Sequence, residues 1–171
     1  MITTDRLTLR PLTRGDWQFI IDIFNQPDFI RHVGDKGIRT QADAIDYLEQ
    51  GPMLCHQTHG FSMLAMERRA ALTTKSSQTD VVGLCGLLQR DNMPCPDIGY
   101  ALLPPYYRQG YTLEAAQAVI RYFSHIRPLL AVISKGNFAS QQLLLTLGFK
   151  PTQATLVAKA FGDDVTVFQL D

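Results

Sequence analysis

A chain of 171 residues suits one domain of ordinary size, spanning residues 1–171, and it can bury a two-layer core without metal or disulfide support. Its residues are 46% hydrophobic and 19% charged, a composition typical of a soluble globular protein. Lys and Arg together equal Asp and Glu in number, so the chain lacks the net charge that attracts nucleic acid or an anionic membrane, and we expect neither as a partner.

The cysteines and the N-terminal residues indicate a cytoplasmic protein. Cys55, Cys85 and Cys95 are odd in number and lack CxxC spacing, so they predict neither a disulfide framework nor a zinc site, and we expect no metal site. The first residues alternate like a strand and contain no apolar signal core, and no apolar run reaches membrane-spanning length.

The first quarter of the chain predicts one strand and two helices. Alternating leucines predict a strand over residues 6–12, and apolar residues at helical spacing predict a helix over 14–26 that Pro27 ends. Glycines and mixed charges predict a loop over 28–39, and a second helix is expected over 41–50.

The next segment predicts a loop and a pair of strands. Gly51 is expected to end the second helix, so that 50–60 forms a loop. Apolar residues predict strands over 61–67 and 81–88, joined by the long polar loop 68–80.

Residues 97–124 predict a strand, a turn and a helix in that order. The strand covers 97–103, a proline pair ends it, and an amphipathic helix begins at Thr112 after a polar turn around Gly110. The first N–H groups of a helix have no intrahelical partner and carry the positive end of the helix dipole, so they bind anions. We therefore expect a pyrophosphate beside the Arg108 side chain, held by the N–H groups of Gln109, Gly110, Tyr111 and Thr112.

The C-terminal third predicts a parallel crossover followed by a strand pair. The apolar strand 129–134 comes after the amphipathic helix, which predicts a right-handed parallel crossover from the strand 97–103. A second short helix is expected over 137–147, and a strand begins at Phe149. The strand 165–170 is expected to run antiparallel to it. As an edge strand it could pair with a second copy, so a monomer and a homodimer both stay open.

Four motifs in order resemble those of the GCN5-related N-acetyltransferase (GNAT) superfamily, specifically the branch that contains the ribosomal-protein N-terminal acetyltransferases. They are DRLTLRPL at 5–12, IGYAL before YRQGYTLEAA within 98–116, SKGNFAS at 134–140 and LGF at 147–149. A glycine-centred turn alone would be weak, but four elements with compatible spacing are specific. The match covers most of the chain, from residue 5 to residue 149.

The resemblance implies a fold and a cosubstrate. The fold is α+β, with a central, mostly antiparallel mixed sheet, a splayed pair of parallel strands and flanking helices. The cosubstrate is acetyl-CoA, with its pyrophosphate on the turn 108–112 and its pantetheine arm along 99–103, where unpaired backbone groups would bind it like an added strand. Backbone N–H groups of Leu102 and Leu103 would face the thioester oxygen and stabilise its developing charge.

The resemblance also implies residues for direct acetyl transfer to a primary amine, either a protein N-terminus or a small molecule. Asp97 stands where the branch commonly has glutamate and is the first candidate for the base, acting directly or through water. Asn137 and Ser140 match the NxxS positions, where asparagine orients the cofactor or the local backbone and serine can lie near the sulfur. Leu144 replaces the tyrosine that protonates the thiolate in many members, which makes Ser140 the substitute donor.

Each candidate also has a simpler structural interpretation. Asp97 follows a proline and would fit a turn, and Arg108 would fit a solvated turn. Asn137 would fit a helix cap, and Ser140 a polar residue in the first turn of a helix.

Two other classes of function stay open. One is a catalytically silent CoA-binding sensor or binding module of the same fold, which Leu144 favours. The other is a nucleotide-binding enzyme, but the sequence has no GK[ST] motif. Residues 128–134, about 20 positions after the glycine turn, also lack the acidic residue that would hold a ribose hydroxyl.

Overall fold

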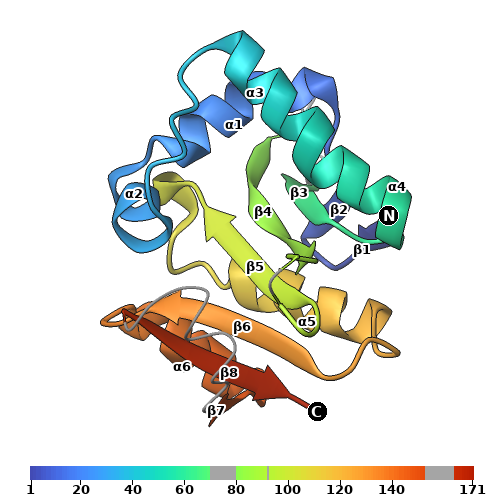
Figure 1. The fold of residues 1–171 in the computed structure, drawn as a ribbon, viewed down its shortest axis with the longest axis vertical. Coiled ribbons are helices and arrows are strands. Elements are labelled where there is room, and N and C mark those ends of the chain that lie inside the picture. The colour runs from blue at the N-terminus through green and yellow to red at the C-terminus, as the bar shows by residue number, and fades with distance from the viewer. Residues whose placement is uncertain (70–79, 92, 153–163) are drawn as a thin grey trace.

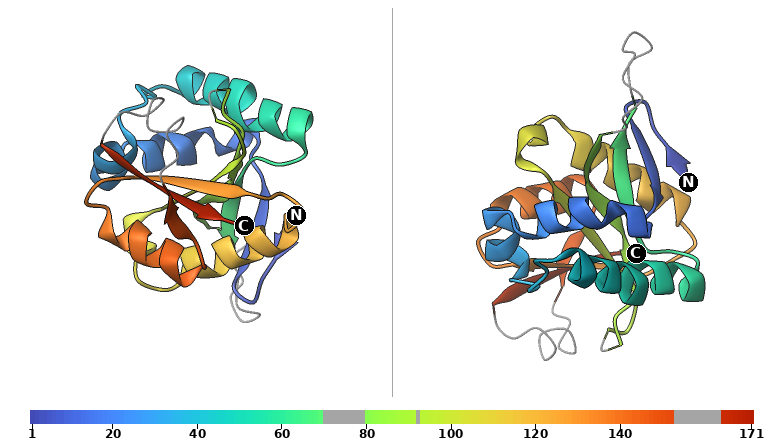
Figure 2. Two further views of the ribbon diagram at one scale, coloured as in Figure 1. Left: turned by 60° about the horizontal axis from the view of Figure 1, so that its bottom comes forward. Right: turned by 90° about the horizontal axis from the view of Figure 1, so that it is seen from above.

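In the described residues, eight strands form one mixed sheet that lies between two layers of helices (Figures 1 and 2). The computed structural model describes residues 1–69, 80–91, 93–152 and 164–171. In spatial order the strands are β1 Ile2–Thr3, β2 Leu7–Pro11, β3 Met63–Arg68, β4 Val81–Leu88, β5 Asp97–Leu102, β6 Leu129–Ser134, β8 Val165–Leu170 and β7 Lys150–Thr152.

Neighbouring strands are antiparallel except for β5 and β6, which run parallel. The predicted α+β fold, a mostly antiparallel mixed sheet with one parallel pair and flanking helices, is therefore confirmed. One detail is wrong: β8 lies between β6 and β7 and is not an edge strand. Most of the polar loop 68–80 and most of the turn before β8 lie outside the described residues.

Helices cover both faces of the sheet. One layer consists of a 3-10 turn Arg14–Asp16, α1 Trp17–Phe24, α2 Pro27–Val33, α3 Gln41–Leu48, a π-helical segment Glu49–Met53 and α4 Leu54–His59. The other layer contains α5 Tyr111–Tyr122, which connects β5 to β6, and α6 Phe138–Thr146, and a 3-10 turn Pro104–Tyr106 precedes α5. The two layers lie on opposite sides of the strands in Figure 2.

The first helical layer differs from the sequence prediction at Pro27. Pro27 does not end a helix: it is the first residue of α2, so part of the expected loop 28–39 is helical. Proline lacks an N–H group and has a fixed φ, and both properties suit the first helical position, where the N–H would be unpaired.

A second difference concerns Gly51. The chain continues from α3 through the π-helical segment into α4, although that segment contains both Gly51 and Pro52. Gly60 ends the helical run instead, because it is the residue that adopts the left-handed conformation (φ 76°) and donates its N–H to His56 O at 2.9 Å. The expected loop 50–60 is therefore mostly helix.

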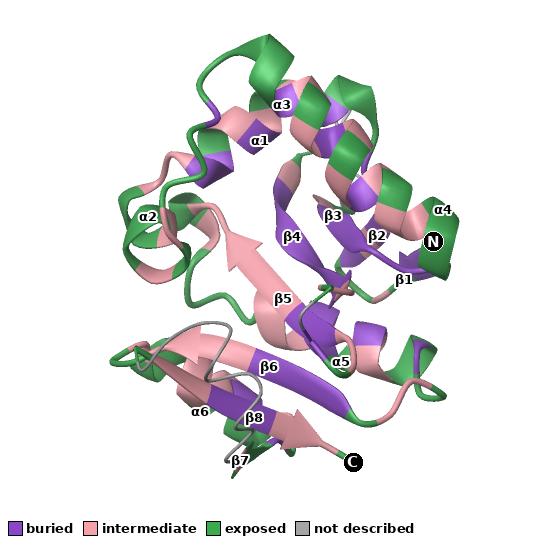
Figure 3. Ribbon diagram, in the orientation of Figure 1, coloured by how far each residue is buried: buried purple, intermediate pink, exposed green. Residues whose placement is uncertain are grey.

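Two large apolar clusters fill the space between the sheet and the helical layers, and a third, small one consists of Met93, Leu130 and Val167. The larger cluster joins the sheet to α5 and α6, and its fully buried members include Leu87, Leu144 and Phe168. The second cluster joins the other face to α1 and α3 and includes Ile20 and Leu48. The central strands β3 and β4 are thus buried on both faces over most of their length (Figure 3).

Candidate active site

The parallel pair β5 and β6 separates soon after it begins. One residue pair, Asp97 and Leu130, joins the two strands in the described part of the chain, and the Leu130 N–H donates to Pro96 O at 3.0 Å. Burial falls along both strands beyond this point: their first residues are buried and the later ones are half-buried (Figure 3). The two strands therefore form a gap that is closed at Asp97 and open toward Leu102.

The backbone of β5 presents alternate residues to this gap. The Leu103 N–H donates to Val82 O on the β4 side at 2.9 Å, which makes Leu102 and Gly83 a non-hydrogen-bonded pair. The N–H and C=O groups of Leu102 point away from β4, as do those of Tyr100 two residues earlier. The expectation that the Leu103 N–H faces a ligand is therefore wrong, because β4 already binds that group.

The turn before α5 has an unusual backbone. Arg108 is the one residue other than glycine with a positive φ in the described segments (58°), and Gly110, the N-cap of α5, also has a positive φ (79°). A side chain in the left-handed region costs roughly 1–2 kcal/mol. Alternation of left-handed and right-handed residues turns successive N–H groups toward one concave side, and such concavities bind anions. This strain is therefore a signal of function.

The amide groups of the turn are available to a ligand. Within the described chain, the first backbone bond of α5 is donated by the Glu114 N–H to Gly110 O at 3.1 Å. The N–H groups of Arg108, Gln109, Gly110, Tyr111 and Thr112 have no carbonyl acceptor among the described loop contacts. The five residues predicted to surround an anion are thus contiguous, although α5 begins at Tyr111 and not at Thr112.

Asp97 lies at the closed end of the gap and is paired with arginine. Its side chain is 2% exposed, and Arg90 donates from Nε to Oδ1 at 2.9 Å and from Nη2 to Oδ2 at 3.1 Å. Burial raises the pKa of Asp97, and the hydrogen bonds and charge of Arg90 oppose that shift. The turn interpretation of Asp97 is incorrect, because the residue belongs to β5.

The two NxxS residues lie at the start of α6. Asn137 is the N-cap, and its Oδ1 accepts the Ser140 N–H at 3.1 Å, so the capping interpretation is confirmed. Ser140 is half-buried in the first turn. Leu144 is fully buried in the larger apolar cluster. The position that carries a tyrosine in many acetyltransferases is therefore part of the core here.

Sequence reasoning missed Tyr100. Its phenol donates to Ser140 O at 3.4 Å, which places a hydroxyl from β5 beside the first turn of α6. Burial raises the pKa of Tyr100 to about 12, so the phenol stays protonated at neutral pH. The signal in the sequence is the tyrosine of the IGYAL motif, within the strand that precedes the glycine turn.

Sequence reasoning also missed α2. Its His32 Nδ1 lies 2.9 Å from Ser134 Oγ at the end of β6, and its Asp28 carboxylate lies near enough to Tyr107, after β5, to affect the pKa of that phenol. Burial and the Asp28 carboxylate raise the pKa of Tyr107. The helix therefore touches both sides of the open end of the gap.

Metal and membrane features are not found in the described segments. No group of three or more His, Cys, Asp or Glu side chains there could hold a metal ion. Within the same segments, the helices are too short or too polar to cross a membrane.

The described residues combine a sheet that has one splayed parallel pair with a turn, after the first strand of that pair and at the start of a helix, whose N–H groups have no carbonyl acceptor among the described loop contacts. Together these features define a class of acyl-group transferases. The acetyltransferase (GNAT) domain family model matches residues 6–150. The chain therefore belongs to the GNAT acetyltransferase family.

Individual relatives agree with this assignment. The chain is 29% identical over 153 residues to the uncharacterized N-acetyltransferase YoaA of Bacillus subtilis, covering 88% of this chain and 82% of that protein. A crystal structure of an acetyltransferase from Agrobacterium tumefaciens superposes with a TM-score of 0.76 at 19% identity, covering 99% of this chain and 93% of the other. The microcin C7 self-immunity acetyltransferase MccE, solved with acetyl-CoA and AMP, gives 0.74 at 15% identity, covering 98% and 93%.

Proposed function

We propose that this protein transfers the acetyl group of acetyl-CoA directly to a primary amine, at a protein N-terminus or on a small molecule. The observation that carries the proposal is that two segments with unpaired backbone groups follow one another in the chain: the edge of β5 that faces the gap, and the N–H groups of 108–112. The first suits an amide-rich arm and the second suits a pyrophosphate, in the order in which CoA carries them. The complex of MccE with acetyl-CoA and AMP supports the same donor here.

Acetyl-CoA, when bound, supplies an activated thioester. In our proposal the Leu102 N–H donates to its carbonyl oxygen and stabilises the negative charge that develops as the amine attacks. The N–H groups of the turn, together with the Arg108 guanidinium, hold the diphosphate. Asn137 fixes the first turn of α6, and Ser140 and Tyr100 are the hydroxyl groups available to protonate the departing thiolate.

The base is Asp97 acting through water. Four residues of strand lie between it and Leu102, a distance of about 16 Å, so in our proposal the proton passes along a chain of several waters. A carboxylate whose pKa is raised by burial is a better proton acceptor at neutral pH than an exposed one.

The four sequence motifs favour the branch of ribosomal-protein N-terminal acetyltransferases, which act in the cytoplasm on protein N-termini. The acceptor is tested by incubating the protein and acetyl-CoA with panels of peptides, polyamines and aminoglycosides while release of the free CoA thiol is followed. Thiol release with peptides supports the assignment to the branch of ribosomal-protein N-terminal acetyltransferases. Release with polyamines or aminoglycosides alone contradicts that assignment but supports acetyl transfer to an amine.

The donor is tested by thermal unfolding with acetyl-CoA, ATP or NAD. A ligand at a hundredfold excess over its Kd adds about 2.7 kcal/mol, or roughly 5–10 °C in Tm for a chain of this size. We expect such a shift with acetyl-CoA and none with the nucleotides. A shift without thiol release for any amine would favour the silent CoA-binding module, which the buried Leu144 supports.

A further inference from the structure

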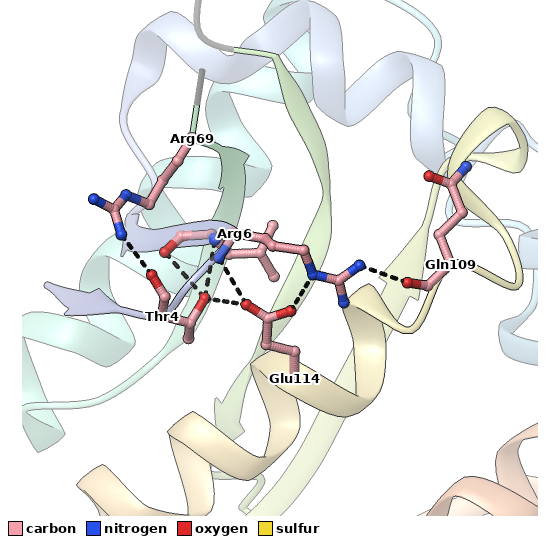
Figure 4. A network of polar contacts seen from close by, with 6 residues as sticks. Thr4, Arg6, Arg69, Gln109 and Glu114 are labelled. Carbon is pink, nitrogen blue, oxygen red and sulfur yellow. Dashed lines mark hydrogen bonds and ion pairs between the residues drawn. The ribbon is translucent and has the colours of Figure 1, made fainter. Parts of the chain in front are cut away.

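A polar network links the start of the chain to the turn before α5 (Figure 4). Arg6, between β1 and β2, donates from Nη1 to Gln109 O at 2.8 Å and from Nε to Glu114 Oε2 at 2.6 Å. The other carboxylate oxygen, Glu114 Oε1, accepts the Arg6 N–H at 2.9 Å and the Thr4 hydroxyl at 2.6 Å. The Arg6 guanidinium also lies 4.5 Å from the centre of the Tyr111 ring. Arg6 is therefore held from several directions.

The contact with Gln109 has a geometric consequence. A trans peptide is planar, so the Gln109 carbonyl and the Gly110 N–H point in opposite directions. Because Arg6 binds the carbonyl on the β1–β2 side, the Gly110 N–H is directed away from that side. Without this bond the peptide could rotate, since Gly110 has no Cβ to hinder other backbone conformations. A rotated peptide would turn its carbonyl oxygen, which is partly negative, toward the anion.

The surroundings keep Arg6 in this one arrangement. Its side chain is 46% exposed and would be mobile alone, but Glu114, which is 20% exposed, binds both its backbone and its guanidinium. A Cβ added to Gly110 would lie 3.3 Å from Arg6 Nη2, so the guanidinium lies directly against the turn. An exposed ion pair contributes little to stability, which leaves positioning as the better explanation for such a network.

We propose that Arg6 is a positioning residue of the donor site: it fixes the Gln109–Gly110 peptide with the N–H toward the pyrophosphate of acetyl-CoA. This inference rests on the proposed function. It predicts that Arg6 contributes to binding of the diphosphate and has no part in the chemistry at the thioester.

The test compares two acetyl donors, acetyl-CoA and acetyl-pantetheine, which has the same thioester and arm but no diphosphate. The variant Arg6→Met keeps an apolar stem over Tyr111 and removes the donors. We expect this variant to raise the Kd of acetyl-CoA, measured by calorimetry, about tenfold. The reason is that it loses the charge-assisted hydrogen bond to Gln109 O, which orients the Gln109–Gly110 peptide. The kcat at saturating acetyl-CoA and the kcat/KM for acetyl-pantetheine should stay within twofold.

Control variants separate positioning from folding. Arg14→Met removes another exposed arginine, which is paired with Glu49 at 3.0 Å and has no polar contact with the turn among the described residues. The Kd of acetyl-CoA and the kcat/KM for acetyl-pantetheine should be unchanged in this variant. Arg6→Lys keeps the positive charge but lacks the planar guanidinium that binds Gln109 and Glu114 at once, so an intermediate Kd is expected. If Arg6→Met does not fold, the comparison of the two donors is made with Arg6→Lys. The Gly110 amide resonance should move in Arg6→Met and stay in Arg14→Met.

The outcomes are distinct. A rise in the acetyl-CoA Kd with acetyl-pantetheine unchanged supports the proposal. An unchanged Kd, or equal losses for both donors, overturns it while the proposed function stands. A wild-type protein that does not bind acetyl-CoA overturns the proposed function itself.

Discussion

The two edges of β5 are paired very differently. Toward β4 the strand forms six consecutive residue pairs, Asp97 with Leu88 through Leu102 with Gly83, whereas toward β6 it forms the single pair of Asp97 with Leu130. β4 is buried along nearly its whole length, while most of β5 is half-buried. One edge of β5 thus contributes to the stability of the sheet, and the other leaves backbone groups unpaired at the place where we propose that acetyl-CoA binds. Substitutions on the two sides should therefore change different quantities.

The largest expected effect is on stability from the β4 side. Leu87→Ala empties a fully buried position and should lower the free energy of unfolding by about 2–5 kcal/mol, or roughly 5–15 °C in Tm. Calorimetric unfolding checks this, and the acetyl-CoA Kd of the folded variant should be unchanged. Leu145→Ala, at a position that is 43% exposed, should change stability by less than about 0.5 kcal/mol. Lost affinity in Leu87→Ala without lost stability would contradict this difference between the two edges.

The next effect concerns the closed end of the gap. Asp97→Asn should lower kcat/KM about a hundredfold, because a base that acts through water is removed. The wild-type rate should fall as the pH drops through the raised pKa of Asp97, and the variant should lack this acid limb. Initial rates between pH 5 and about pH 8 measure both.

A matched control exists for the lost ion pair. Asp16 is also buried, and Arg10 donates to it from Nη1 at 2.9 Å and from Nη2 at 2.7 Å. Asp16→Asn and Asp97→Asn should both lose about 1–3 kcal/mol of stability, because each replaces a buried carboxylate that accepts two hydrogen bonds from an arginine. Arg10 keeps its second carboxylate, Glu67, at 2.6 Å in the first variant. Activity should fall in Asp97→Asn alone. Equal losses of activity in the two variants would show that Asp97 acts through folding.

A smaller effect is expected at the turn. Gly110→Ala places a side chain at a φ of 79° and near Arg6, so it should weaken acetyl-CoA binding about tenfold and cost about 1 kcal/mol of stability. Gly60→Ala has a similar φ of 76° at the end of α4 and nothing within 4 Å, so it should cost similar stability without affecting affinity. Titration calorimetry and thermal unfolding separate the two. Equal affinity in both variants would remove the turn from the donor site.

The smallest effect is a pH dependence of the network around the turn. Burial raises the pKa of Glu114, but the hydrogen bonds from Thr4 and Arg6 outweigh it, and the pKa lies below its usual value. The stabilisation is therefore complete above about pH 4.3 and is lost as the pH falls through the lowered pKa. The Tm difference between wild type and Glu114→Gln should be constant above that pH and shrink in acid. A difference that grows in acid would contradict the assignment.

Local patterns predicted much of this molecule. The strand over 81–88 has the predicted bounds, and the strand over 165–170 does as well, because continuous or alternating apolar runs have few alternatives. The turn 108–112 was recognisable because glycine, an adjacent charge and a helix start follow one another in sequence. Structural features that depend on a few residues adjacent in sequence can therefore be predicted from the sequence.

The missed features depend on partners distant in sequence or on context around a single residue. Pro27 and Gly51 are strong local signals, but tertiary packing and cap geometry decided whether they ended a helix. The engagement of the Leu103 N–H by Val82 and the contact of Tyr100 with Ser140 required the sheet register and the position of α6. No spacing rule contains that information.

The separation of β5 from β6 also determines how quickly amide hydrogens exchange with solvent deuterium. Gly99 and Ala101 donate toward β4 and should exchange slowly, whereas Tyr100 and Leu102, facing the gap, should exchange quickly in the free protein. Along this one strand, protection should therefore alternate residue by residue. A donor lying in the gap would remove the alternation, so the isotope pattern of these amides would report occupancy without any chemical turnover.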